Sequence, residues 1–218
     1  MTVLTREAAR RIYDRIGSRQ DTQAFYEDRA TEILVRNGEF GAARRVLELG
    51  CGTGRFALGL LTTQLSEVAR YRALDLSPVM VGLARGRLAP FASRVEVVQT
   101  DGSPPSDEPT ASCDRFVSNF VLDLLADEDI ASVVGEAHRI LEPGGLLCVC
   151  SLSTGSGPFS RFVARAWSWV HAARPALVGG CRPLELLDWI DAERWRVRHH
   201  EKRTPFGVPS EVLVAERR

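Results

Sequence analysis

The sequence predicts an α/β fold in which a mostly parallel sheet is covered by helices on both faces. Short apolar runs alternate with helix-like stretches from Arg45 to Leu152, a pattern typical of βαβ units with right-handed crossovers. The last of these runs is apolar on both faces, as a strand buried from both sides should be. The 218 residues, 44% hydrophobic and 26% charged, are sufficient for one large domain or a domain with a small cap.

Two helices are expected before this alternation begins. Residues 5–16 contain neither glycine nor proline, and residues 22–37 mix apolar and charged side chains before the stop signal Asn37-Gly38. We therefore predict an N-terminal helical cap over residues 1–40 and a main domain over residues 41–218.

The alternating part predicts five strands with helices between them. The strands are expected at 45–49, 71–75, 95–99, 113–118 and 146–152. The helices are expected at 55–65, 78–88 and 128–141. Ser77-Pro78 is a helix start signal, and Glu142-Pro-Gly-Gly145 predicts a turn before the fifth strand.

The alternation stops after Leu152, where an insertion over about 153–183 is expected. It begins with a loop and continues as a helix over 159–173, and a further helix is expected over 183–192. Residues 195–200 and 211–215 predict two terminal strands, paired antiparallel at the sheet edge. The complete prediction is a seven-stranded, mostly parallel sheet with an antiparallel edge strand.

The stretch Val46-Leu-Glu-Leu-Gly-Cys-Gly-Thr-Gly-Arg-Phe-Ala57 joins a strand to a helix through three alternate glycines. Glycine permits a tight turn and lets the backbone approach a ligand closely. Glu48 precedes the first glycine, Asp75 ends the next strand and Asp101 follows the third. Because parallel strands end at one edge of a sheet, the three carboxylates should converge on one crevice.

These features, in this order, resemble the motifs of class I S-adenosylmethionine-dependent methyltransferases. The matching stretches are LELGCGTGRFA, ALDLSPVMVGLAR, Asp101-Gly102, DRFVSNFVLDLL and HRILEPGGLL. They are most similar to the small-molecule group of the ubiquinone/menaquinone-biosynthesis (type 11) kind, over about residues 40–153. The resemblance implies a Rossmann-like methyltransferase fold, S-adenosylmethionine as cofactor and residues 41–218 as the domain that binds it.

The resemblance also implies which positions contact the cofactor. They are Tyr13, Glu48, Gly50, Cys51, Gly52, Gly54, Asp75, Leu76, Met80, Asp101, Gly102 and Asn119. The glycine-rich run would line the methionine part, with Glu48 near the amino group. Asp75 would bind the ribose hydroxyls, and Asp101-Gly102 would meet the adenine.

The remaining positions have roles that the same resemblance suggests. Leu76 would lie beside the adenine, with Met80 packed nearby. Asn119 would face the sulfonium and the methyl acceptor, and Tyr13 would close over the cofactor.

The catalytic group is not determined by the sequence. Amine and thiol acceptors need little beyond proximity, whereas a hydroxyl or a carbon acid needs a general base. Asp123, Tyr26 and His171 are the candidates for that base. We expect no metal site, because no His, Cys and Asp cluster has the spacing of metal ligands.

We therefore predict a methyltransferase acting on a small, apolar organic acceptor. A phospholipid or membrane-associated lipid methyltransferase is the alternative, because residues 159–182 mix aromatic and arginine side chains. A nicotinamide-dependent oxidoreductase would need G-x-G-x-x-G, and Gly54 comes one place too early for it. A non-catalytic cofactor-binding protein is the last alternative, although the cofactor motifs carry no damage.

Composition bounds the partners and the location. Twenty-eight basic and 28 acidic residues give no net charge, so we expect no nucleic acid partner. No apolar stretch is long enough to span a bilayer, although peripheral membrane contact stays open. Five cysteines without a C-x-x-C pair favour a reducing cytoplasm. The acceptor, the methylated atom and the oligomeric state are left open.

Overall fold

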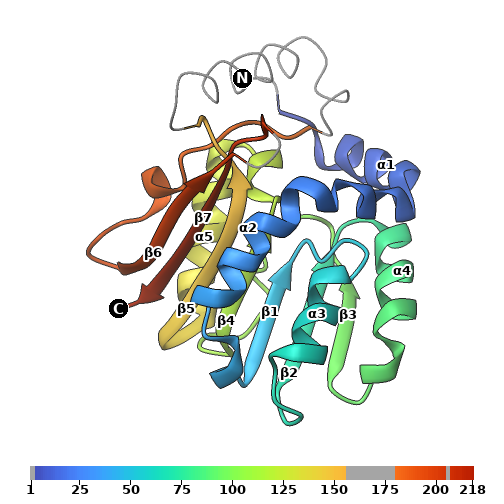
Figure 1. Cartoon of the computed structure of the whole chain (residues 1–218), viewed down its shortest axis with the longest axis horizontal. Coiled ribbons are helices and arrows are strands. Elements are labelled where there is room, and N and C mark those ends of the chain that lie inside the picture. The colour runs from blue at the N-terminus through green and yellow to red at the C-terminus, as the bar shows by residue number, and fades with distance from the viewer. Residues whose placement is uncertain (1–2, 156–179, 205–206) are drawn as a thin grey trace.

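The computed structural model describes residues 3–155, 180–204 and 207–218, which build one seven-stranded sheet (Figure 1). The strands are β1 (Arg45–Leu49), β2 (Arg70–Asp75), β3 (Val95–Gln99), β4 (Cys113–Asn119), β5 (Leu141–Leu152), β6 (Trp195–Arg203) and β7 (Ser210–Arg217). Their order in the sheet is β3-β2-β1-β4-β5-β7-β6. Neighbours from β3 to β5 pair in parallel, and β7 is antiparallel to both β5 and β6. The predicted fold class is confirmed.

Helices cover both faces of this sheet (Figure 1). They are α1 (Arg6–Ile16), α2 (Ala24–Asn37), α3 (Arg55–Thr63), α4 (Pro78–Leu88) and α5 (Asp127–Ile140). One core lies under α2, α3 and α4, and a second lies under α5. Alternate residues of β5 serve the two cores: Cys148 and Cys150 face the first, whereas Leu147 and Val149 face the second.

Local sequence explains where two of the helices begin. The hydroxyl of Thr5 accepts a hydrogen bond from Ala8 N at 3.2 Å at the start of α1. The hydroxyl of Ser77 accepts one from Met80 N at 3.1 Å at the start of α4, with Pro78 in the first turn. Each side chain satisfies a backbone N–H that the helix leaves without a partner.

The helix predicted over residues 183–192 is wrong, since the structure holds only a 3₁₀ turn, Leu186–Trp189. Tertiary contacts occupy the backbone that a helix would use. Leu184 N donates to Leu152 O at 2.9 Å, and Leu186 N donates to a Glu211 carboxylate oxygen at 3.1 Å. The helix expected over residues 159–173 lies outside the described residues.

Strand β5 begins earlier than expected. Leu141 already pairs with Cys113 of β4, so the strand follows α5 directly and includes the turn predicted at 142–145. The two terminal strands pair antiparallel at the edge as predicted. The antiparallel strand β7 lies one place inside that edge, with β6 outermost.

The N-terminal residues divide between two positions. Helix α2 packs on β5 and β7 and belongs to the layer that covers the sheet. Helix α1 and the 3₁₀ segment Gly17–Gln23 contact α4 and lie near the carboxyl ends of the strands (Figure 1). The domain boundary between residues 40 and 41 stays a prediction.

The strand order reverses direction between β1 and β4. In open α/β sheets a crevice forms at this switch point, outside the carboxyl ends of the strands. The glycine-rich run that follows β1 lies at this point, and the functional site is built around it.

Two further features concern the outside of the fold. Arg85 of α4 donates two hydrogen bonds, at 3.2 and 2.9 Å, to the carbonyl oxygen of Val97 on the outermost strand β3. None of the helices within the described ranges is long and apolar enough to cross a bilayer.

We expect Gly54→Ala to destabilise the fold. Gly54 has φ +77°, and a Cβ there would lie 3.1 Å from Ala84 Cα, so both backbone conformation and packing oppose a side chain. We predict a loss of about 1 kcal/mol or more, or roughly 2–4 °C in Tm. Gly82→Ala on α4, where a Cβ would meet nothing within 4 Å, should be neutral or stabilising. Equal Tm values for the two variants in thermal unfolding would contradict this account.

Candidate functional site

The turn between β1 and α3 is held tightly against β2. Gly50 N and Cys51 N both donate to Leu74 O, at 2.8 and 2.9 Å. Gly50 and Gly52 have φ values of +76° and +52°, a region that side chains other than glycine disfavour. A Cβ at Gly50 would also overlap the Val121 side chain. Only glycine fits there, and the turn leaves its backbone open to a ligand.

Asp75 connects this turn to the end of β2. Its Oδ2 accepts a hydrogen bond from Gly52 N at 2.8 Å, and its Oδ1 accepts one from Ser77 N at 2.9 Å. Burial raises the pKa of Asp75 above its ordinary value, while the two backbone N–H groups oppose that rise. Each oxygen keeps a further lone pair for a ligand hydroxyl.

Glu48 is a buried acid at the carboxyl end of β1. Only 1% of the residue is exposed, and its Oε2 accepts a hydrogen bond from the Tyr71 hydroxyl at 2.8 Å. Burial raises the pKa of Glu48 to about 8, against the opposing effect of Tyr71 and with a smaller contribution from Asp75. Glu48 therefore holds a proton at neutral pH unless a positive charge lies beside it.

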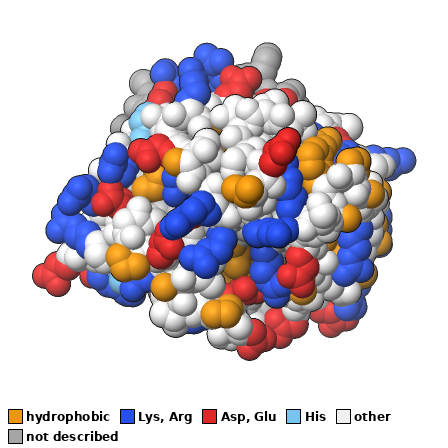
Figure 2. Space-filling view, turned by 90° about the horizontal axis from the view of Figure 1, so that it is seen from below, with side chains coloured by type: hydrophobic (Ala, Val, Ile, Leu, Met, Phe, Trp, Pro, Cys, Tyr) orange, Lys and Arg blue, Asp and Glu red, His pale blue; other side chains and the backbone are white. Residues whose placement is uncertain are grey.

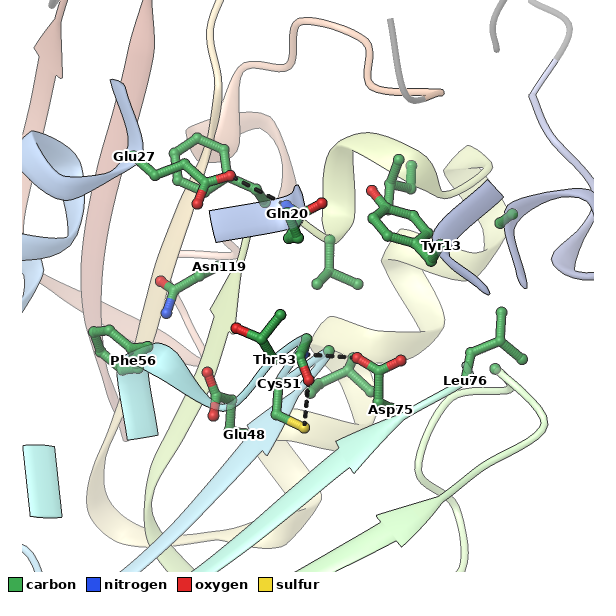
Figure 3. Close-up of a pocket in the computed structure, with 18 of the residues that line it drawn as sticks. Tyr13, Gln20, Glu27, Glu48, Cys51, Thr53, Phe56, Asp75, Leu76 and Asn119 are labelled. Carbon is green, nitrogen blue, oxygen red and sulfur yellow. Dashed lines mark hydrogen bonds between the residues drawn. The ribbon is translucent and has the colours of Figure 1, made fainter. Parts of the chain in front are cut away.

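A cavity of about 650 Å³ lies over these groups, within the size range of small-molecule sites. Figure 3 shows two sides to it. Tyr13, Asp75 and Leu76 lie on one side, whereas Glu27 and Asn119 lie on the other with Gln20, Phe56 and Glu48. The cavity is long enough to bring groups from the N-terminal helices, the glycine-rich turn and β4 to one space.

Two side-chain contacts fasten the N-terminal segment to this site. Ser77 Oγ donates to Asp14 Oδ1 at 2.6 Å, which joins α1 to the end of β2. Asp21 accepts hydrogen bonds from Thr53 Oγ1 and from Arg87 Nη2, both at 2.6 Å. The hydrogen bond from Arg87 holds the pKa of Asp21 below its usual range, although burial opposes it. The sequence gives no sign of the roles of Asp14, Asp21 and Arg87, because no local pattern links residues so far apart.

Most of the residues that the sequence assigned to a cofactor line the cavity. They are Tyr13, Glu48, Gly50, Cys51, Gly52, Asp75, Leu76, Gly102 and Asn119. Three others do not line it. Gly54 packs against Ala84 at the start of α3, and Met80 is only 1% exposed, inside α4's buried face.

Asp101 is the third residue outside the cavity lining. It is exposed, and its carboxylate accepts hydrogen bonds from Ser103 N at 2.8 Å and Ser103 Oγ at 3.0 Å. These hydrogen bonds lower the pKa of Asp101. The geometry is that of a loop acid stabilising its own turn.

Asn119 is the residue whose surroundings most directly indicate a ligand. It ends β4 and lines the cavity. Its Oδ1 and Nδ2 are both buried, and neither has a hydrogen-bond partner among the described residues. Buried polar atoms without partners are rare and costly, so a polar group of a ligand is expected to contact this amide.

Of the three candidates for a general base, the structure describes the side chain of Asp123. Asp123 is fully buried and does not line the cavity. Its Oδ2 accepts a hydrogen bond from Leu152 N at 3.2 Å, and burial raises its pKa to about 7. The side chain of Tyr26, on α2, and the whole of His171 lie outside the described residues.

A second hollow, of about 380 Å³, lies at the opposite, amino-terminal ends of the strands. Basic side chains gather on this face (Figure 2). Two of its arginines are paired with acids: Arg45 with Glu142 at 3.1 Å and Arg72 with Glu108 at 2.6 Å. The charges of these two arginines are thus compensated by acids of the same chain. We place the functional site at the larger cavity.

The chain is similar to known proteins in sequence and in fold. A family model described as "Methyltransferase domain" matches residues 46–145. A malonyl-[acyl-carrier protein] O-methyltransferase from Marinomonas sp. (strain MWYL1) is 31% identical over 164 residues, covering 74% of this chain and 56% of that protein. The ubiquinone/menaquinone biosynthesis C-methyltransferase UbiE from Syntrophotalea carbinolica is 28% identical over 166 residues, covering 73% of this chain and 67% of its own length.

Among solved structures, the [4+2]-cyclase SpnF matches with a TM-score of 0.75 and 16% identity, covering 100% of this chain and 98% of that one. A likeness at that identity shows the fold alone. The chain spans about half the length of the first curated relatives it matches.

We expect Glu48→Gln to change how stability depends on pH. Because the folded-state pKa of about 8 lies above the ordinary 4.5, the folded protein binds more protons than the unfolded chain in that interval. The unfolding free energy of the wild type therefore falls as pH rises through it. The amide of the variant carries no such proton, and its oxygen can still accept from the Tyr71 hydroxyl. The stability of the variant relative to the wild type should rise between about pH 5 and pH 8.

Denaturant unfolding at the two pH values measures this difference. Glu67→Gln, at an exposed position, is the matched control and should shift stability equally at both. A Glu48→Gln difference that is also the same at both pH values would show that Glu48 ionises normally in the folded protein.

Proposed function

Since the chain belongs to the class I S-adenosylmethionine-dependent methyltransferases, we propose that it transfers a methyl group from S-adenosylmethionine to a small, apolar organic acceptor. The observation that carries this proposal is the contact between Asp75 and Gly52 N at the floor of a 650 Å³ cavity. It brings an acid and an open glycine turn to the switch point of the sheet, where such folds bind nucleotides.

The described residues fit this cofactor. A Cβ at Gly52 would meet nothing within 4 Å, so its open side faces the cavity and leaves room for the methionine part. Asp75 is within reach of the ribose hydroxyls, and Glu48 of a positively charged amino group. A Cβ at Gly102 would lie 3.2 Å from Leu76 Cδ1, so the Leu76 side chain lies beside Gly102. It would give the adenine an apolar wall.

Tyr13 and Asn119 complete the arrangement. Tyr13 on α1 lines the cavity from the N-terminal side, where it would cover the cofactor. The unpartnered amide of Asn119 would lie between the cofactor and the acceptor. For Gly54, Met80 and Asp101 we propose supporting roles in the turn, helix α4 and the loop after β3.

The bound cofactor would supply an activated methyl group on a sulfonium. The chain's own part is to hold the acceptor atom in line at about 3 Å and to exclude water. The N-terminal segment, which lines the cavity and is held by Asp14 and Asp21, would serve that purpose.

No general base is assigned. Asp123 lies behind the cavity wall, where it holds the end of β5 through Leu152 N. We propose a positioning role for it. We propose that residues 153–183 add to the acceptor side, because an insertion after the fifth strand leaves the sheet at the edge where the parallel strands end. The lipid alternative rests on the same stretch, of which residues 156–179 lie outside the described part.

We further propose that the protein works in the cytoplasm without a nucleic acid partner. The zero net charge supports the second point. The five cysteines, all within the described ranges, form no disulfide, which suits a reducing compartment.

We expect Asp75→Ala to weaken S-adenosylhomocysteine binding at least tenfold. Two ribose hydroxyls would lose a charged acceptor, and such hydrogen bonds are worth about 1.5–3 kcal/mol each, where about 1.4 kcal/mol is tenfold. Calorimetric titration of a variant with unchanged fold measures the loss.

Asp101→Ala is the matched control, because Asp101 is exposed and lies outside the cavity lining. Its affinity should stay within about threefold of the wild type. A folded Asp75→Ala variant with wild-type affinity would remove the basis of the proposed cofactor site.

A further inference from the structure

The cavity extends beyond the strand ends into the space between α2 and α3. This part, called here the α2–α3 branch, is lined by Thr31 and Val35 of α2 and by Phe56, Gly59, Leu60 and Thr63 of α3. Helix α2 packs on β5 and β7, whereas α3 packs on α4, so the two helices leave a slot between them. A Cβ at Gly59 would meet nothing within 4 Å, which keeps the slot open at its middle.

The described lining of the cavity is rich in acids. The acidic residues are Asp21, Glu27, Asp28, Glu48, Asp75 and Asp129, and the basic ones are Arg6 and Arg55. Arg55 pairs with Asp28 at 2.6 Å and lies 3.9 Å from a Glu27 carboxylate oxygen, and Arg6 pairs with Asp129 at 2.9 Å. Both bases of the described lining are thus balanced by acids. Asp21 is paired as well, with Arg87 at 2.6 Å. Acids still outnumber bases in the described lining, and this excess favours a cation over a carboxylate or phosphate.

Polar groups gather where the branch meets the rest of the cavity. Glu27 and Asn119 lie on the same side of the cavity as Phe56 (Figure 3). Gln20 Nε2 is 3.5 Å from Glu27 Oε1, and the amide of Asn119 has no partner among the described residues. Burying that amide without a partner is costly, so the bound molecule needs a polar head at this point and an apolar body along the slot.

From this arrangement we propose that the α2–α3 branch is the acceptor subsite, and that it takes an amine with a slender apolar tail. The head binds beside Glu27 and Asn119 as an ammonium and loses one proton to solvent before its nitrogen lone pair can take the methyl group. The tail lies along Phe56, Leu60 and the open side of Gly59. The inference rests on the proposed function, because it assigns the acceptor of that reaction. It excludes acceptors whose head is an anion.

Octylamine and octanoate test the proposal, since they share a tail and differ in the charge of the head. Each is titrated calorimetrically into the protein saturated with S-adenosylhomocysteine. We expect octylamine to bind at least tenfold more tightly than octanoate. Glu27→Gln should reduce that ratio about tenfold, as expected for the loss of one charge-assisted hydrogen bond.

Gly59→Leu fills the branch, and Gly82→Leu on α4 is its control. Both are exposed helix positions at which a Cβ meets nothing within 4 Å, so both should fold. We expect Gly59→Leu to weaken octylamine at least tenfold and Gly82→Leu to leave it unchanged, with S-adenosylhomocysteine affinity within about threefold in both.

The failures of the two proposals are distinguishable. Equal binding of octylamine and octanoate, no octylamine binding, or equal octylamine affinity of the two leucine variants overturns the branch assignment while cofactor binding stands. Absence of S-adenosylhomocysteine binding to the wild type overturns the proposed function, and the assignment of an acceptor falls with it.

Discussion

The carboxylate of Asp75 is the interaction on which the site depends. Its two oxygens hold Gly52 N and Ser77 N, so the turn after β1 and the turn after β2 keep a fixed relation. Ser77 passes the connection on, since its hydroxyl donates to Asp14 of α1 and accepts from Met80 N at the start of α4. One side chain thereby sets the glycine turn, a helix start and the position of the N-terminal segment. The glycine turn, the start of α4 and the N-terminal segment are thus connected beside the cavity through Asp75 and Ser77.

Burial and charge act together in this cavity. Glu48 and Asp75 both have raised pKa values because they are withdrawn from water. A positively charged ligand beside Glu48 would favour its ionised form, so binding at neutral pH would release a proton to solvent. The cavity therefore combines a cost of ionisation in the empty protein with a gain when a cation arrives. Such a site favours cationic over anionic ligands without any change of conformation.

The sequence was sufficient where the signal is local. Strand positions, the glycine turn and the acid at the end of β2 follow from alternation, glycine spacing and parallel-strand geometry. It was insufficient where distant residues meet: Tyr71 with Glu48 and Arg87 with Asp21 lie on separate elements. The helix expected over 183–192 failed for the same reason, because Leu184 and Leu186 bond to β5 and Glu211 instead. Asp101 follows the third strand, as the convergence of the three acids required. Its carboxylate nevertheless accepts a hydrogen bond from Ser103 N and lies outside the cavity lining.

The side chains at the two outer strands bear on aggregation of the protein at high concentration. An exposed strand edge is a template for pairing with another chain and so for aggregation. On β3 the guanidinium of Arg85 occupies the carbonyl oxygen of Val97, and β6 carries Arg196, Arg198, Lys202 and Arg203 along its length. These bases are paired with Glu216, Glu185 and Glu201. A second copy would have to displace the arginine at one edge and desolvate charged side chains at the other. The open sheet is thus guarded at both ends against growing from copy to copy.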